Sequence, residues 1–245
     1  LSCRARRRRR AGAILLAETA LGAPSARDAA LSLAARVAAE GLGILPWEEA
    51  GAGDFLARAR WYAARLAERG ARGGEGGEAA TFEALSEAAL RADAAAWLGP
   101  FVSGGPGPVL TGSALRRALE ALLPYAARAA LDREAPERVE LPSGSSRPVL
   151  YAAGADPVVE ARVQEFYGLA EHPRLCGRPL VLRLLSPAGR PLQVTADLPG
   201  FWRGSWAEAR KELRGRYPKH DWPEDPAAAA PSAKGLKKKP PATGR

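Results

Sequence analysis

The spacing of apolar residues changes near residue 136, and this change restricts the chain to a fold that mixes helices and strands. Before that point apolar side chains recur every three to four residues, as in 31–37 and 115–123, which is typical of amphipathic helices. After it they alternate in 138–141 and 148–152, as in β-strands. We therefore predict an α+β fold in which a helical portion precedes a C-terminal domain of helices and two β-hairpins.

Capping residues and glycines mark the ends of the helices that we expect in the first half. Ser25 is the expected N-cap of a helix that Gly41 ends, and Asp54 is the expected N-cap of a second helix that Gly70 ends. Apolar positions at helical spacing then recur through 82–98. These signals predict three helical segments before residue 100.

A glycine-rich stretch at 70–79 divides the predicted helices into two groups. It has almost no apolar side chain to bury, so it is predicted to be a linker. It separates a helical segment, 23–69, from a C-terminal domain that we assign to residues 80–231. Within that domain Ser113 is expected to cap one more helix, which ends at Pro124.

The C-terminal domain carries two turn signals between alternating segments. The sequence Pro-Ser-Gly-Ser at 142–145 separates the first pair of predicted strands. The sequence Ser-Pro-Ala-Gly at 186–189 separates a second pair, 180–185 and 192–195. Each pair is predicted to form a β-hairpin.

Two more helices are expected around these hairpins. A short one begins at Asp156-Pro157 and ends at Gly168, because proline suits the first turn of a helix. A final helix spans 199–214 and buries one stripe that includes Trp202 and Trp206. We therefore predict that the C-terminal domain ends in a helix that carries these tryptophans.

The last part of the chain reads as an extended strap and a tail. The prolines of 217–226 keep that segment extended. From Ala227 onward Ala, Pro, Lys and Gly dominate, and we predict disorder there, including a basic tail at 232–245.

The net charge of +9 comes from the two ends of the chain. Six of the 36 basic residues lie in 1–10 and five lie in 234–245, which leaves 25 basic residues to face 27 acidic ones. The body is therefore close to neutral. This distribution argues against a continuous basic face and favours local contacts with phosphate.

Two groups of basic residues are the candidate nucleic-acid contacts. The first occupies alternate positions near the N-terminus, and the second lies on the final helix and the start of the strap. The candidates are Arg6, Arg8, Arg10, Arg203, Arg210, Lys211, Arg214, Arg216 and Lys219. Two interpretations stay open for each group: contacts with a nucleic-acid backbone, or an ordinary solvated strand or helix face.

The sequence does not predict a catalytic or metal site. His220, Asp221, Glu224 and Asp225 lie close together, but a catalytic site needs such groups to converge in a pocket, which an extended proline-rich strap seldom provides. We expect the strap to pack its aromatic residues on the domain, and an independent hydrolase is the least favoured hypothesis. Cys3 and Cys176 are far apart in sequence and predict neither a disulfide framework nor a zinc site.

The C-terminal sequence carries long motifs. It reads LLSPAGRPLQVTADL at 184–198, then the pair Phe201-Trp202, then RKELRGRYPKHDWPEDP at 210–226. This region resembles the C-terminal end of HrpB-type bacterial DEAH-box ATP-dependent RNA helicases, and the resemblance extends over about 80–231. Trp206 departs from it, because that family usually has Tyr there.

The resemblance implies an accessory region separated from its motor. Residues 1–22 would be the remnant of an OB-like domain, with its last strand running through Arg4 to Leu16, and Leu1 in a chain without methionine fits a truncated sequence. In the intact family two RecA-like domains bind ATP and Mg²⁺ through GxxxxGK[ST] and DExH motifs, and neither string occurs here. We therefore expect no cofactor in this chain and no activity from it alone.

The resemblance also implies the partners. These would be RNA or another single-stranded nucleic acid and the motor domains of the same polypeptide. The sequence has no run of eighteen apolar residues, so we expect a cytoplasmic location and no membrane. The alternative hypothesis is a protein-interaction module that makes no direct contact with RNA.

Overall fold

Helices dominate the first half of the chain and a five-stranded sheet the second. The computed structural model describes residues 5–71, 77–105, 107 and 109–233. The chain divides into two compact units, Leu1–Leu131 and Asp132–Arg245. This division falls within the last helix before the sheet, whereas the sequence placed its boundary in the glycine-rich stretch, of which residues 72–76 lie outside the described residues.

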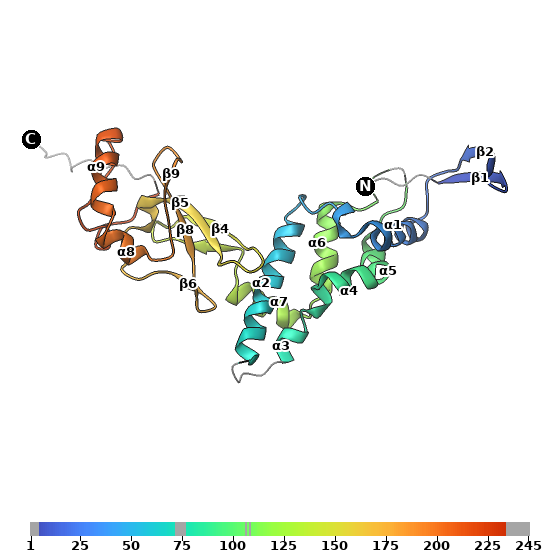
Figure 1. The fold of residues 1–245 in the computed structure, drawn as a ribbon, viewed down its shortest axis with the longest axis horizontal. Coiled ribbons are helices and arrows are strands. Elements are labelled where there is room, and N and C mark those ends of the chain that lie inside the picture. The colour runs from blue at the N-terminus through green and yellow to red at the C-terminus, as the bar shows by residue number, and fades with distance from the viewer. Residues whose placement is uncertain (1–4, 72–76, 106, 108, 234–245) are drawn as a thin grey trace, which may run out of the picture. The chain divides into compact units, whose positions relative to one another are not determined.

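The N-terminal basic segment forms a two-stranded antiparallel hairpin (blue in Figure 1). Its strands are β1 (Arg6–Ala11) and β2 (Ile14–Ala20), and every residue of both is exposed. The single strand expected through this segment is therefore wrong. Gly12, with φ +59°, lies in the left-handed region that glycine tolerates, and it allows the chain to reverse.

The helices of unit 1 begin where local capping groups allow. The α-helices are α1 (Ala26–Glu40), α2 (Ala52–Ala71), α3 (Gly77–Ala80), α4 (Glu87–Ala92), α5 (Ala94–Leu98), α6 (Gly112–Ala121) and α7 (Tyr125–Glu134), the last of which continues into unit 2. Ser25 caps α1 as predicted, because its hydroxyl accepts a hydrogen bond from the Asp28 N–H at 3.1 Å. Short 3₁₀ turns lie at Leu42–Ile44, Glu83–Leu85 and Gly99–Phe101.

Three expected helix ends in unit 1 are wrong by a few residues. Helix α2 begins at Ala52, so Asp54 lies in its first turn, and the helix continues through Gly70. Helix α6 is capped by Thr111, whose hydroxyl accepts from the Ala114 N–H at 3.2 Å, and Ser113 lies inside the helix. Both Thr111 and Ser113 carry a hydroxyl group that suits an N-cap, and the sequence alone does not decide which of them begins the helix.

The sheet of unit 2 has the strand order β3-β4-β5-β8-β9. Its strands are β3 (Arg138–Glu140), β4 (Ser146–Leu150), β5 (Val158–Arg162), β8 (Val181–Leu185) and β9 (Pro191–Thr195). Strands β5 and β8 are parallel, and the other neighbours are antiparallel. The connection from β5 to β8 contains a small hairpin, β6 (Arg174–Leu175) and β7 (Arg178–Pro179).

The short helix expected from Asp156 to Gly168 does not form. Residues 158–162 are β5, and a 3₁₀ turn at Val163–Phe166 follows. The apolar residues have helical spacing here only because a strand and a 3₁₀ turn follow each other directly. Val159 and Ala161 are buried, at 0% and 2% exposure, as alternate residues on the core face of a strand. This segment forms a strand because parallel pairing with β8 supplies its backbone hydrogen bonds.

The final helix is divided in two at Gly204. Helix α8 (Leu198–Arg203) and helix α9 (Trp206–Arg216) replace the continuous helix expected over 199–214. Both lie beside the sheet in unit 2 (orange to red in Figure 1). The Asp197 side chain caps α8 by accepting from the Gly200 N–H at 2.9 Å.

Trp206 lies at the centre of an aromatic cluster between these helices and the sheet. Its ring is 5.4 Å from that of Trp202 and 6.3 Å from that of Trp222, measured between centroids. The rings of Tyr167 and Phe201 lie at 5.9 and 6.0 Å. Most of these pairs meet edge to face, which is a favourable arrangement for aromatic rings.

Two indole N–H groups of this cluster hold the strap in place, one from α9 and one from within the strap. Trp206 donates to the Pro223 carbonyl at 3.0 Å, and Trp222 donates to the Tyr217 carbonyl at 2.9 Å. Trp222 is buried and Tyr217 is half-buried in the core, so the strap packs as its aromatic residues suggest.

Residues 227–233 are ordered against unit 2, so the disorder expected from Ala227 onward is wrong for this part. The Ser232 N–H donates to the Gln164 carbonyl at 3.1 Å, and Ala229 packs on the core. The Gly168 N–H donates to the Pro226 carbonyl at 2.9 Å, and the positive φ of Gly168 presents this N–H to the strap. Composition did not reveal these contacts because most of them use backbone groups. Residues 234–245 of the predicted basic tail lie outside the described residues.

Replacement of Trp206 by Ala should destabilise unit 2 severely. Trp206 is 1% exposed, so truncation removes a large buried surface and leaves a cavity among four aromatic rings. We expect a loss of about 3–5 kcal/mol in the free energy of unfolding, measured by urea denaturation. Lys211→Ala, at an exposed position of the same helix, is the control and should change it by less than about 0.5 kcal/mol. Equal effects of the two variants would contradict the central role of Trp206.

Tyr167 should make stability fall at alkaline pH. Burial, with a smaller contribution from the charge of Asp221, raises the pKa of the Tyr167 phenol well above its ordinary value. Above about pH 10 the unfolded chain therefore releases a proton that the folded chain retains, and the free energy of unfolding decreases by up to about 1.4 kcal/mol per pH unit from this group.

The variant Tyr167→Phe tests this dependence. At pH 7 it removes only a long hydrogen bond, 3.4 Å, to the Asp221 carbonyl and should cost less than about 1 kcal/mol. Above pH 10 its free energy of unfolding should fall less steeply than that of the wild type. Tyr125→Phe, at a position that is 80% exposed, is the control and should follow the wild-type profile. Identical slopes for all three proteins would refute the effect.

Candidate nucleic-acid interface

The six basic residues predicted on the final helix and the strap fall into two classes. Arg210 and Arg216 have carboxylate partners, whereas the other four are exposed without one. Those four are Arg203, Lys211, Arg214 and Lys219, and no ion pair involves them within the part of the chain that the structure describes.

Arg210 is committed to the strap. Its Nε donates to the Trp222 carbonyl at 2.8 Å, and its Nη2 lies 2.9 Å from a carboxylate oxygen of Glu224. Its side chain is 24% exposed, so most of it packs between α9 and the strap. Arg210 is therefore a structural clamp, and its guanidinium is not available in the way that the sequence interpretation assumed.

Arg216 forms an ion pair within α9. It lies 3.0 Å from Glu212, one helical turn earlier, and both side chains are more than half exposed. Such surface pairs contribute little to stability, because solvent screens them. The local charge of α9 is nevertheless reduced at this end.

Lys211 and Arg214 form the available basic pair of α9. They are three residues apart and so lie on one side of the helix, away from Trp206 and Leu213, which are buried. Arg203 ends α8, and Lys219 follows α9 in the strap. Because Trp206 and Leu213 fix the inner side of α9, the cations on its outer side are held on a rigid element.

The arginines of the N-terminal hairpin are divided by the two faces of the strands. Arg6 and Arg8, both predicted contacts, bond to Glu18 of the other strand, with Arg8 Nε 2.8 Å from the carboxylate. The two guanidinium groups lower the pKa of Glu18. Arg10 is exposed and lies past a register shift, across from Leu15. The hairpin belongs to unit 1 and the α9 cations belong to unit 2.

The sequence interpretation did not identify Glu18 as a partner or Arg7 and Arg9 as the remaining cations. Which residues of β1 and β2 lie opposite each other depends on where the chain turns, because the turn sets the register of the two strands. The alternation of a strand separates odd from even positions, but the partner of each position can be assigned only when the turn at Gly12 is known.

Among the acidic and histidine residues of the strap, Glu224, Asp225 and His220 have side-chain contacts, whereas Asp221 is exposed and its backbone carbonyl accepts from the Tyr167 hydroxyl at 3.4 Å. Glu224 binds Arg210, and Asp225 accepts from the Ala227 N–H at 3.0 Å. The His220 ring packs near those of Tyr217 and Trp222. No group of three or more potential metal ligands occurs among the described residues.

The most deeply buried charge of unit 2 is Glu165, which the sequence did not single out. It is 0% exposed and accepts two hydrogen bonds from Arg147 Nη2, at 2.7 and 2.8 Å. It also accepts from the Ser145 hydroxyl and from the Arg162 N–H at 3.2 Å. A carboxylate with this many donors is satisfied, so the network holds the 3₁₀ turn to strand β4 and has no free group for chemistry.

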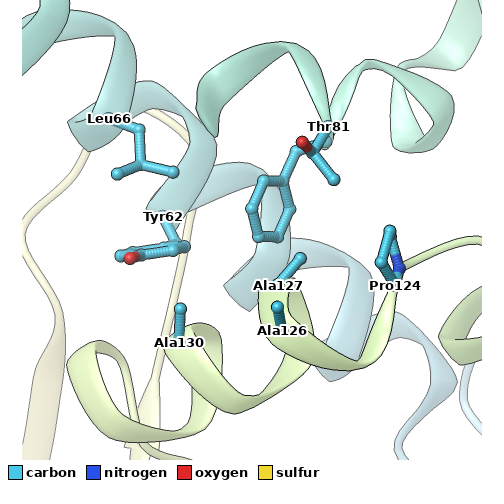
Figure 2. A pocket seen from close by; sticks show the side chains of 8 residues that line it. Tyr62, Leu66, Thr81, Pro124, Ala126, Ala127 and Ala130 are labelled. Carbon is cyan, nitrogen blue, oxygen red and sulfur yellow. The ribbon is translucent and has the colours of Figure 1, made fainter. Parts of the chain in front are cut away.

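Unit 1 contains an apolar pocket of about 210 Å³. Figure 2 shows alanines of α7 facing Tyr62 and Leu66 of α2 across it. The other lining residues are Thr81, Phe82 and Pro124, so no charged side chain lines the pocket. Its chemistry suits an apolar side chain and not a phosphate group.

None of the helices in the described ranges combines the length and the hydropathy that crossing a membrane would require.

Comparison with known proteins finds one family over more than half of the chain. Residues 97–226 match the model of the HrpB-type ATP-dependent helicase C-terminal region. A curated relative, the ATP-dependent RNA helicase HrpB of Escherichia coli (strain K12), is 42% identical over 152 residues. That match covers 61% of this chain and only 19% of the relative.

Solved structures give the same result. The crystal structure of the E. coli DExH-box NTPase HrpB matches 94% of this chain with a TM-score of 0.71 and 34% identity. A crystal structure of the E. coli DEAH/RHA helicase HrpB matches 89% with a TM-score of 0.59 and 30% identity. This chain covers 27% and 26% of those two chains, so it spans about a quarter of their length.

Replacement of Arg210 by Ala should reduce stability, because the side chain clamps the strap. The lost hydrogen bonds of a charged donor should lower the free energy of unfolding by about 2 kcal/mol, measured by urea denaturation. Arg214→Ala removes the same charge from the same helix and should change this free energy by less than about 0.5 kcal/mol. A larger loss with Arg214→Ala would contradict the division into clamping and available residues.

Proposed function

Because the chain belongs to the family of HrpB-type ATP-dependent helicase C-terminal regions, we propose that it is an accessory region that binds single-stranded RNA beside an ATP-driven motor. One observation carries this proposal. Four exposed cations of α8, α9 and the strap lack carboxylate partners within the described ranges, although α9 also carries Glu208 and Glu212; they are Arg203, Lys211, Arg214 and Lys219.

The physical basis of the proposal is the placement of these cations on a fixed scaffold. Lys211 and Arg214 are held by a helix whose inner side is locked by Trp206. Phosphate contacts from such residues need little additional ordering of the protein and release counterions from the nucleic acid. They would position an RNA strand without reading its sequence.

We assign ATP and Mg²⁺ to the motor domains that the family carries, and not to this chain. The sequence has neither a GxxxxGK[ST] string nor a DExH string. In this proposal the motor domains are the second partner, the helicase acts in the cytoplasm, and the accessory region positions RNA for them. RNA-stimulated ATP hydrolysis by this chain alone would contradict the assignment.

The apolar pocket of unit 1 favours a second candidate function. A cavity of about 210 Å³ lined by Tyr62, Phe82 and small residues of α7 could receive one apolar side chain of a protein partner. In that case the chain would be an interaction module, and the cations of α9 would only solvate a surface helix.

A charge reversal on α9 tests the first function. Lys211→Glu combined with Arg214→Glu should weaken the binding of a labelled oligouridylate, measured by fluorescence anisotropy over a series of salt concentrations. Loss of two phosphate contacts should reduce the slope of log K against log salt by about 1.4 and raise the Kd about tenfold at low salt.

The matched control is Arg174→Glu combined with Arg190→Glu. It changes the net charge equally at exposed positions of the same unit that belong to neither α8, α9 nor the strap, and should have a much smaller effect. Equal losses in the two variants would show only long-range electrostatics. Wild-type protein that does not bind RNA at low salt would refute this function and leave protein docking as the better explanation.

A further inference from the structure

The hairpin of β1 and β2 presents two chemically different faces. In the antiparallel register Arg8 lies opposite Glu18, whereas Arg7 lies opposite Thr19 and Arg9 opposite Ala17. Successive side chains of a strand point to opposite faces. Arg6 and Arg8 therefore share the face of Glu18, and Arg7 and Arg9 share the other face.

The charge of the first face is partly neutralised. Glu18 bonds to both Arg6 and Arg8, and these guanidinium groups lower its pKa, so the carboxylate is ionised at neutral pH. A phosphate that approached this face would meet one negative charge between two positive ones. The attraction is correspondingly weaker there.

The second face has no such acid. Arg7 and Arg9 are exposed, their cross-strand neighbours Thr19 and Ala17 are uncharged, and neither arginine has an ion pair within the described residues. A guanidinium group is always charged and can form paired hydrogen bonds to phosphate oxygens. This face is the more favourable one for an anion.

The spacing of the two arginines restricts the form of that anion. Strand positions two residues apart are separated by about 6.8 Å, which is similar to the separation of neighbouring phosphates in an extended single strand. The strands contain no aromatic side chain on which a base could stack. The face is therefore suited to a sugar–phosphate backbone and not to base recognition.

We propose that Arg7 and Arg9, and not Arg6 and Arg8, bind consecutive phosphates of a single-stranded nucleic acid. This assignment rests on the proposed RNA-binding function and adds a second contact region to it. It transfers the role expected for Arg6 and Arg8 to the opposite face of the same hairpin.

Paired variants of equal charge test the assignment. Arg7→Ala with Arg9→Ala is compared with Arg6→Ala with Arg8→Ala in the full chain, using labelled oligouridylate over a series of salt concentrations. The first pair should raise the Kd about tenfold at low salt and reduce the salt slope by about 1.4, and the second should raise the Kd less than about threefold. All four residues are exposed, so the fold should be retained, which circular dichroism checks.

A third variant tests the role of the carboxylate. Glu18→Gln removes the charge that neutralises Arg6 and Arg8, and should tighten oligouridylate binding about threefold. Oligothymidylate should respond to all variants in the same way if the contacts are to phosphate, whereas losses confined to RNA would assign the contact to the 2′-hydroxyl and overturn the phosphate assignment.

The outcomes separate this inference from the function on which it rests. Binding that depends on Lys211 and Arg214 but not on Arg7 and Arg9 overturns this inference alone. An equal or greater loss with the Arg6 and Arg8 pair also overturns it. Absence of binding by the wild-type chain overturns both proposals.

Discussion

The burial of Trp206 is the interaction on which the rest of unit 2 depends. Its ring contacts those of Tyr167, Phe201, Trp202 and Trp222, and its indole N–H donates to the strap at 3.0 Å. One side chain therefore joins the 3₁₀ turn after β5, both terminal helices and the strap. Because the interior is close-packed, these elements have little freedom to move separately. The residues on the outer side of α9 are therefore also held in fixed positions.

This arrangement explains why similar residues on one helix have different roles. Arg210 is close enough to the strap to donate to the Trp222 carbonyl, whereas Lys211, the next residue, points away from the core. The rotation of about 100° per residue in a helix is sufficient to separate them. A count of basic residues along the sequence treats both alike. The packing of Trp206 and Leu213 decides which cation is structural and which remains available.

Features of the fold that depend on neighbouring residues could be predicted from the sequence, and features that depend on distant partners could not. The Ser25 cap and the end of α1 at Gly41 are local, and both were predicted correctly. Strand β5 was mistaken for a helix, because Val159 and Val163 have helical spacing and the pairing with β8 cannot be read from it. The same limit applied to the candidate site, where Glu18 and Glu224 neutralise arginines from positions 10–14 residues away.

The strap has a consequence for the order in which the protein can fold during synthesis. Trp222 and Pro226 fill the core around residues 163–168, yet they are translated long after that turn and after all five strands of the sheet. While the strap is still inside the ribosome, the aromatic cluster is incomplete and its rings face solvent. Unit 1 is a separate compact unit that precedes the strap in sequence, and it can form first. The strap thus delays the completion of unit 2 until residues 217–226 have been synthesised, and in this interval exposed tryptophans would attract chaperones or cause aggregation.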